Sequence, residues 1–117
     1  NEKAVWNAMQ LQFKIGDAFN GSKTALEFAS RYPKSDQSTN ALLRAAQTFE
    51  QMAQLKEAAE VLEKLAEREP KDANRWRELA ADFYAMDGLA MKARPIYNEL
   101  KEKGNYENRV RLLTKLE

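Results

Sequence analysis

The sequence contains no cysteine and no histidine, and only three prolines and four glycines among its 117 residues. The absence of cysteine and histidine excludes disulfide bonds, thiol nucleophiles, imidazole acid–base catalysis and almost every zinc or haem site. Paired carboxylates are then the remaining route to catalysis. Pairs such as Asp82 with Asp87, or Glu57 with Glu60, arise by chance in a chain with 18 acidic residues. We therefore expect a protein that is not an enzyme and needs no cofactor or metal.

Residues that favour β-strands are also scarce. Val, Ile and Thr together supply 9 residues, whereas Ala, Leu, Glu and Lys supply 55. The first group favours strands and the second favours helices. The composition therefore excludes a sheet protein and predicts an all-α fold.

Neither sign of charge dominates, since 19 basic residues face 18 acidic ones and the net charge is +1. A chain with so little net positive charge has no electrostatic field that attracts a polyanion, so we expect no nucleic-acid partner. No apolar run approaches the roughly 18 to 20 residues of a transmembrane helix, and no secretory signal is recognisable. The chain opens at Asn1 without methionine, which predicts a piece of a longer protein. The lack of cysteine fits the periplasm and the cytoplasm alike.

Apolar residues recur at intervals of three and four along the whole chain, which predicts amphipathic helices. Six of the expected helices pair into three hairpins, and a seventh helix ends the chain. The helices are separated by breaks at Gly16–Ser22, Pro33, Gln54, Pro70, Asp87–Gly88 and Gly104.

Local patterns predict where several helices begin. Thr24–Glu27 has the form of a capping box, in which a hydroxyl and a carboxylate satisfy free amides at a helix start. Ser38 and Asp72 are suited to cap the helices that follow the first two prolines. Pro95 removes an amide donor from the sixth helix. That helix therefore either starts late, near Lys92, or is kinked.

The hairpins repeat one another in sequence. When Pro33 is aligned with Pro70, the small residues Gly21 and Ala58 fall at the same position. Between the second and third units, Leu42, Ala46 and Phe49 recur 34 residues later as Trp76, Ala80 and Phe83. In this register the turn inside the third unit is one residue longer than the turn inside the second.

Residues 39–72 resemble a tetratricopeptide repeat. The resemblance rests on the 34-residue period and on the order of large, small and aromatic residues that ends in a proline: Leu42, Ala46, Phe49, Ala58, Leu62, Leu65 and Pro70. Residues 31–35 and the long connection that follows them resemble the tetratricopeptide proteins of Gram-negative envelopes. This similarity favours a bacterial protein of the periplasm or outer membrane over a cytoplasmic one.

The resemblance implies a right-handed α-solenoid of three hairpins with a capping helix, about seven helices in one domain. Residues 1–36 would form a degenerate first repeat, 39–72 the second, 73–104 the third and 105–117 the cap. The cap is expected to expose its basic residues and to cover the third repeat with its apolar ones. The basic set is Arg109, Arg111 and Lys115, and the apolar set is Val110, Leu113 and Leu116.

In this family the first helix of each repeat lines a concave groove, so the resemblance implies a partner-binding site there. Amides would serve backbone groups, arginines would meet a carboxylate, and apolar side chains would add contact area. The implied residues are Asn7, Leu11 and Lys14 in the first repeat, Asn40, Leu43, Arg44, Gln47 and Glu50 in the second, and Asn74, Arg77, Glu78 and Tyr84 in the third.

Two functions compete at this point. The first is a non-catalytic scaffold or adaptor that binds another protein or a peptide in the groove. The alternative is a spacer or a self-associating segment of a larger protein, with pairing through the solenoid ends. Leu43 fits either the groove or the core. The residues expected in the core are Trp6, Trp76, Phe49, Phe83 and the four methionines.

Overall fold

The computed structural model describes residues 1–117, with the exception of the side chain of Tyr106. The described chain forms seven α-helices and one short 3-10 helix. Their bounds are α1 Glu2–Lys14, α2 Ala18–Arg31, α3 Ser38–Gln51, α4 Leu55–Arg68, η1 Pro70–Asp72, α5 Ala73–Met86, α6 Ala90–Lys103 and α7 Tyr106–Leu116. The predicted all-α fold is confirmed.

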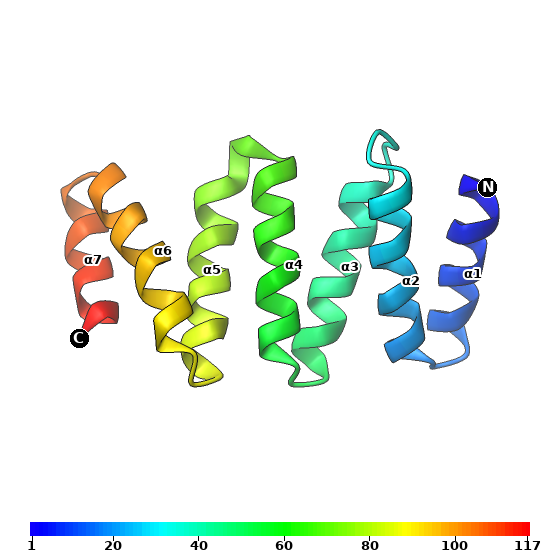
Figure 1. Cartoon of the computed structure of the whole chain (residues 1–117), viewed down its shortest axis with the longest axis horizontal. Helices are drawn as coiled ribbons and strands as arrows, with labels where there is room; N and C mark the ends of the chain where they lie inside the picture. Colours follow the sequence, from blue (N-terminus) through cyan, green and yellow to red (C-terminus); the bar gives the residue numbers. More distant parts are fainter.

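The helices lie side by side in chain order, and the two termini are at opposite ends of the row (Figure 1). Each helix packs on the helix before it and the helix after it. The molecule is consequently elongated, with extents of 47 × 27 × 19 Å. This arrangement is the α-solenoid of helical hairpins that the sequence predicts, with α1–α2, α3–α4 and α5–α6 as hairpins and α7 after them.

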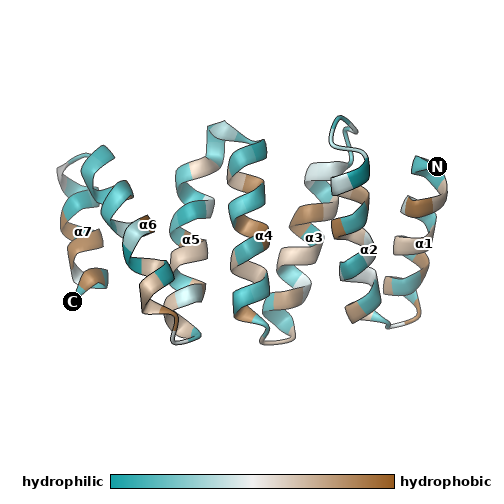
Figure 2. Ribbon diagram, viewed as in Figure 1, coloured by the Kyte–Doolittle hydropathy of each residue, from teal (hydrophilic) through white to brown (hydrophobic). Residues whose placement is uncertain are grey.

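Small residues allow the helices to approach closely. Ala25, Ala58 and Ala80 are fully buried at helix contacts. Gly21 allows α1 and α2 to approach closely, because a Cβ atom there would lie 2.9 Å from the Phe13 ring. The helices carry apolar stripes between polar surfaces (Figure 2), and the stripes of neighbouring helices merge into one continuous core.

Most of the large residues expected in the core are found there. Trp76, Phe49 and Phe83 are buried, and Trp6 is half-buried with its ring 5.2 Å from that of Phe28. Of the four methionines, Met9 is buried and Met52 is half-buried. The prediction is wrong for Met86 and Met91, which are exposed near the α5–α6 turn.

The three turns inside the hairpins share one geometry. Each has three residues, and the central residue has a positive φ: 86° at Gly16, 58° at Ala53 and 77° at Gly88. In each turn the last amide donates a 2.8 Å hydrogen bond to the carbonyl oxygen five residues earlier. This is the Schellman arrangement that ends many helices. The expectation of a longer third turn is therefore wrong.

Equal turns fix the structural register of the repeats. Ala53 follows Gly16 by 37 residues and precedes Gly88 by 35. Helix α3 therefore corresponds to α5 with a shift of 35 residues instead of the 34 that matched the residue types best. In the structural register Phe49 corresponds to Tyr84, and both carbonyls accept the bond that closes their turn.

Two expected helix starts are corrected. Helix α2 begins at Ala18, where the Asp17 carboxylate accepts a hydrogen bond from the Asn20 amide. The first break is thus a three-residue turn, and Thr24 lies inside the helix, where it cannot cap a start. Helix α6 begins at Ala90 and runs through Pro95, so the late start is also wrong. Pro95 is the sixth residue of α6 and therefore removes the hydrogen bond that an amide at this position would donate to the Met91 carbonyl.

The starts after the first two prolines follow the prediction in part. Asp72 is the N-cap residue of α5, although its side chain makes no capping hydrogen bond. Ser38 is the first residue of α3 instead of its cap. The Ser38 hydroxyl donates to the Tyr32 carbonyl at 2.6 Å and so ties the start of α3 to the end of α2.

The last helix is rotated relative to the prediction. Among the described side chains of α7, Leu112 is buried, at 1% exposure, whereas Val110 and Leu113 are exposed. Arg111 and Lys115, which were expected to face solvent on the outer side, reach toward α5. Cross-helix ion pairs therefore set the orientation of this helix together with its apolar stripe.

We expect Ala53→Gly to stabilise the protein by up to about 1 kcal/mol. A left-handed conformation costs a residue with a Cβ roughly 1–2 kcal/mol, and the extra freedom of glycine in the unfolded chain offsets part of the gain. Urea denaturation followed by circular dichroism measures the change. Gly88→Ala is the matched control and should lose about the same amount. A loss of stability in Ala53→Gly would contradict this account of the turn.

Candidate functional site

Side chains of the odd-numbered helices form two links on one side of the solenoid, one between α1 and α3 and one between α5 and α7. We call this surface the odd-helix face and define it by Asn7, Gln10, Asn40, Arg44, Gln47, Glu78, Leu79, Asp82, Arg111 and Lys115. Its first link is Arg44 of α3, whose guanidinium donates to the Gln10 side chain at 2.9 Å. The same group lies 4.0 Å from the centre of the Phe13 ring, a cation–π contact. Arg44 thereby joins α3 to α1 across the intervening helix.

The second link joins α5 to α7. Lys115 donates to Glu78 at 2.6 Å and to Asp82 at 2.9 Å, and Arg111 pairs with Glu78 as well. Asp82 also accepts a hydrogen bond from the Tyr97 hydroxyl of α6, at 2.6 Å. Two carboxylates of α5 are thus neutralised by two cations that lie four positions apart on α7.

The protonation equilibria reflect this network. Partial burial acts to raise the pKa of Glu78, but hydrogen bonds from Lys115 and Arg111 outweigh it and hold the pKa below 4.5. Burial acts to lower the pKa of Lys115, but the bonds to Glu78 and Asp82 outweigh it, so that pKa is raised. Both shifts favour the charged pair at neutral pH.

The predicted residues of the second repeat lie together on the exposed surface of α3. Asn40, Arg44, Gln47 and Glu50 are exposed, and Leu43 is half-buried against the core. The structure thus brings these five residues onto one helix and places Arg44 beside α1.

In the first repeat, Asn7 and Lys14 are exposed on α1. The structural register aligns Asn7 with Arg44, so Asn7 belongs to the odd-helix face. Leu11, which is 58% exposed, aligns instead with the buried Thr48 and Phe83. It lies on the outer edge of the solenoid, and its assignment to the groove is wrong.

Two predicted residues of the third repeat lie elsewhere. Arg77 pairs with Glu99 of α6 and borders a hollow formed with Glu63 and Glu67 of α4, so it lies between even-numbered helices. This contact lowers the pKa of Glu99 from 4.5 to about 2, with Lys103 contributing.

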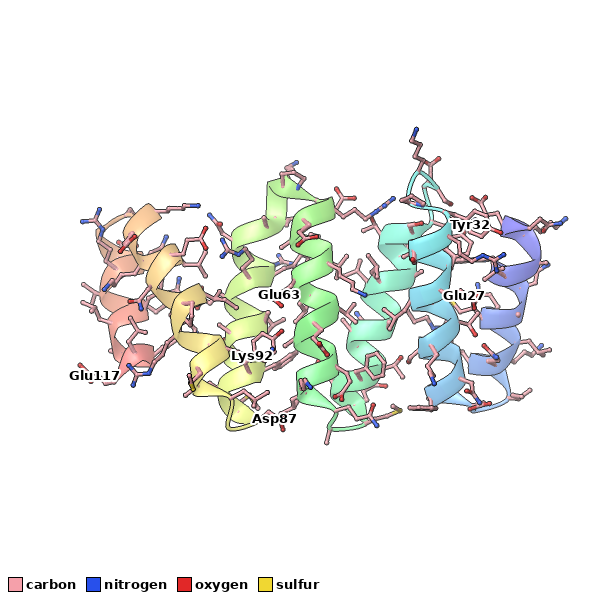
Figure 3. All side chains as sticks on the ribbon, viewed as in Figure 1. Glu27, Tyr32, Glu63, Asp87, Lys92 and Glu117 are labelled. Atoms are coloured by element: carbon pink, nitrogen blue, oxygen red, sulfur yellow. The ribbon has the colours of Figure 1, made fainter. Side chains whose placement is uncertain are left out.

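Tyr84 is 2% exposed and packs at the position of Phe49. Burial raises its pKa, as does its hydrogen bond to Glu63 at 2.7 Å. Glu63 and Lys92, labelled in Figure 3, come from α4 and α6 and both contact this tyrosine. The assignments of Arg77 and Tyr84 to the groove are wrong for the same reason. Aligning α5 with α3 by 34 residues instead of 35 rotates α5 by one position.

Glu78 does lie on the odd-helix face, and Asn74 borders a hollow between α5 and α7. Sequence reasoning missed Leu79 and Asp82, which the 35-residue register aligns with Arg44 and Gln47. Leu79 is 39% exposed. Gly16 and Gly88 were an available signal for the register of α1 against α5, but the turn after α3 has Ala53 at the equivalent position, so no glycine marks the register of α3 against α5.

The hollows of the structure are shallow. One lies between α5 and α7, and a more apolar one lies between α2 and α4 over Leu26, Ala29 and Leu42. Among the described residues, no group of three acidic side chains is arranged to hold a metal ion. An open surface with few enclosed cavities suits contact with a macromolecule better than binding of a small molecule.

Comparison with known proteins agrees with the architecture. Residues 39–82 match the family model of the tetratricopeptide repeat. This match covers α3, α4 and most of α5, and it supports the family to which the repeat pattern points. A search of curated proteins found no match. Within the described part of the chain, none of the helices has the length and apolar character needed to cross a membrane.

We expect Glu78→Gln to loosen α7. The substitution removes the charge that Lys115 and Arg111 share, and we expect a cost of about 1 kcal/mol. Amide exchange along α7 should therefore accelerate about fivefold at neutral pH. Hydrogen-exchange mass spectrometry measures this, with Glu102→Gln on the exposed side of α6 as the control. Unchanged exchange in Glu78→Gln would mean that Leu112 alone holds the helix.

The contact between Glu78 and α7 should weaken at acidic pH. The folded pKa of Glu78 lies below its usual 4.5, so this carboxylate stabilises the docked helix fully above that pH. The contribution is lost as the pH falls through the folded pKa. We expect α7 to open before α4 when the pH is lowered from 6 to 3, and the Glu78→Gln variant to show a weaker dependence. Simultaneous opening of α7 and α4 would contradict this expectation.

Proposed function

We propose that the chain binds a segment of another protein, as an extended peptide or a single helix, across the part of the odd-helix face formed by α1, α3 and α5. The repeat family supports the coarser statement, since tetratricopeptide repeats generally mediate protein–protein interactions. The finer statement, which surface binds and through which residues, rests on the contacts of the odd-helix face.

The position of Arg44 carries the proposal. Its guanidinium lies on the Phe13 ring and donates through Nη1 to Gln10. Arginine has five N–H donors, so most of them remain for a ligand. Because two contacts already order the side chain, binding a carboxylate through it costs less conformational entropy than binding through a free arginine.

The surroundings of Arg44 suit a peptide. Asn40 and Gln47 are exposed on the same helix and carry amide groups that can pair with a backbone. Leu79, at the corresponding position of α5, supplies exposed apolar area. The carboxylates of α5 are already paired with α7. Arg44 lies in the middle of α3, and Glu50, the other exposed charged residue of that helix, lies near its C-terminal end. A ligand segment would therefore place an acidic residue at Arg44 and away from Glu50.

We expect a photo-reactive amino acid at Gln47 to capture the partner in cells. The matched control places the same amino acid at Glu60, which is exposed on α4, an even-numbered helix. The expected result is one covalent adduct from the Gln47 position that is absent from the Glu60 position, with mass spectrometry identifying the captured segment. Capture from Glu60 alone would overturn the assignment of the face.

Arg44→Ala should weaken binding of that captured segment about tenfold, or ~1.4 kcal/mol. Arg94→Ala on the exposed surface of α6 is the control and should leave the affinity unchanged. Thermal unfolding of both variants distinguishes lost binding from lost structure, because Arg44→Ala also removes the contact with Phe13. Equal affinities in a folded Arg44→Ala variant would show that the arginine is not part of the site.

A further inference from the structure

The apolar hollow between α2 and α4 lies inside the row of helices. Its floor consists of Leu26, Ala29 and Leu42, and its volume is about 380 Å³. Leu26 and Ala29 are half-buried, whereas Leu42 is buried. Each helix of the solenoid packs on its neighbours in chain order, along the row (Figure 1). A helix added to either end of the row would therefore pack on α1 or α7 and leave this hollow open.

The next pair of even-numbered helices forms an equivalent hollow with different chemistry. In the structural register the three floor residues align with residues that line the hollow between α4 and α6, namely Glu63, Ala66 and Arg77. Arg77 pairs there with Glu99 of α6, and Lys103 donates to the same carboxylate at 2.8 Å. The second hollow is therefore charged, and its arginine has its counter-ion within the chain.

The same alignment leaves a cation without a carboxylate at the first hollow. Lys64 borders that hollow and aligns with Glu99. The residue that corresponds to Arg77 is Leu42, so the charge that a partner of Lys64 would supply is replaced by an apolar side chain. Lys64 is exposed, and within the described residues it forms no ion pair.

Two further charged residues border the first hollow. Arg68 donates through Nη2 to the Ser35 carbonyl and through Nε to the Thr39 hydroxyl, both at 2.8 Å, so these donors are used within the chain. Glu67 lines both hollows and limits the positive charge. Two cations and one carboxylate leave the rim net positive, which suits a single carboxylate of a ligand at Lys64.

We propose that the hollow between α2 and α4 binds an extended segment of another protein, with one large apolar side chain on the floor and a neighbouring carboxylate at Lys64. The volume lies at the low end for ligand pockets, which favours one side chain over a whole small molecule. Tetratricopeptide repeats generally mediate protein–protein interactions, which favours a protein as the occupant. This site is separate from the odd-helix face and does not depend on the function proposed for that face.

Disulfide tethering measures the chemistry of the hollow directly. Because the chain contains no cysteine, Ser30→Cys places one thiol on the rim. The probes are short peptides that carry a cysteine, one or two glycines, a leucine and an aspartate, and mass spectrometry gives the equilibrium constant of the mixed disulfide at a fixed concentration of reductant. We expect this constant to be about tenfold higher than for the alanine analogue of the probe. Replacing the aspartate of the probe by lysine should lower the constant roughly threefold.

Matched variants locate the preference. Leu26→Glu gives α2 the residue that α4 carries at the equivalent position, Glu63, so the fold should persist while the preference for leucine is lost. Lys64→Glu should reverse the preference for aspartate over lysine. Asn98→Cys, on the exposed surface of α6, is the control site and should show neither preference. Equal constants for leucine and alanine at Ser30→Cys, or the same preference at Asn98→Cys or in Leu26→Glu, would overturn the proposal.

A photo-reactive amino acid at Ser30, introduced into the protein in cells, distinguishes another protein from the protein's own chain. The expected adduct joins this site to another protein, at a segment with an apolar residue next to an acidic one, and is abolished by Leu26→Glu. A link to the same polypeptide chain, an adduct at a segment without this pair of residues, or the absence of an adduct would overturn the proposal.

Discussion

The positive φ at the centre of each hairpin turn is the constraint on which the rest of the structure depends. It allows the chain to reverse in three residues while the last amide reaches the carbonyl five residues back. Because all three turns close in this way, each second helix starts at the same height and rotation relative to the first. The buried alanines then meet at equivalent crossings, and equivalent side chains emerge on the same face. Ala53 adopts this conformation without the freedom of glycine, so packing of α3 on α4 must compensate for the local cost.

The regular backbone carries an irregular distribution of charge. On α3 the odd-helix face presents Arg44, held by an aromatic ring and an amide but not by a carboxylate. On α5 it presents Glu78 and Asp82, and α7 supplies the cations that pair with both. Without α7 the two halves of the face would have opposite signs. With α7 in place both carboxylates of α5 are paired with cations, whereas Arg44 is held without a carboxylate partner.

The fold could be predicted from sequence because the apolar spacing and the helix breakers indicate helical hairpins along the whole chain. The positions of side chains on the third repeat could not, because residue types favoured a register of 34 residues and the turns impose 35. This one-residue difference in register explains two errors of the sequence prediction. Arg77 is predicted in the groove but pairs with Glu99, and Tyr84 is predicted there but is buried. The orientation of α7 was missed for a different reason. Apolar residues surround much of that helix, and the choice of Leu112 depends on ion pairs with α5 that a local pattern does not contain.

The first and last described helices are held differently, and this difference affects the surroundings of Arg44. Helix α7 covers α6 and is fixed to α5 by charge, whereas α1 is held mainly by α2. The groups that position Arg44, the Phe13 ring and the Gln10 amide, both belong to α1. The position of Arg44 on the odd-helix face therefore depends on the packing of α1 against α2.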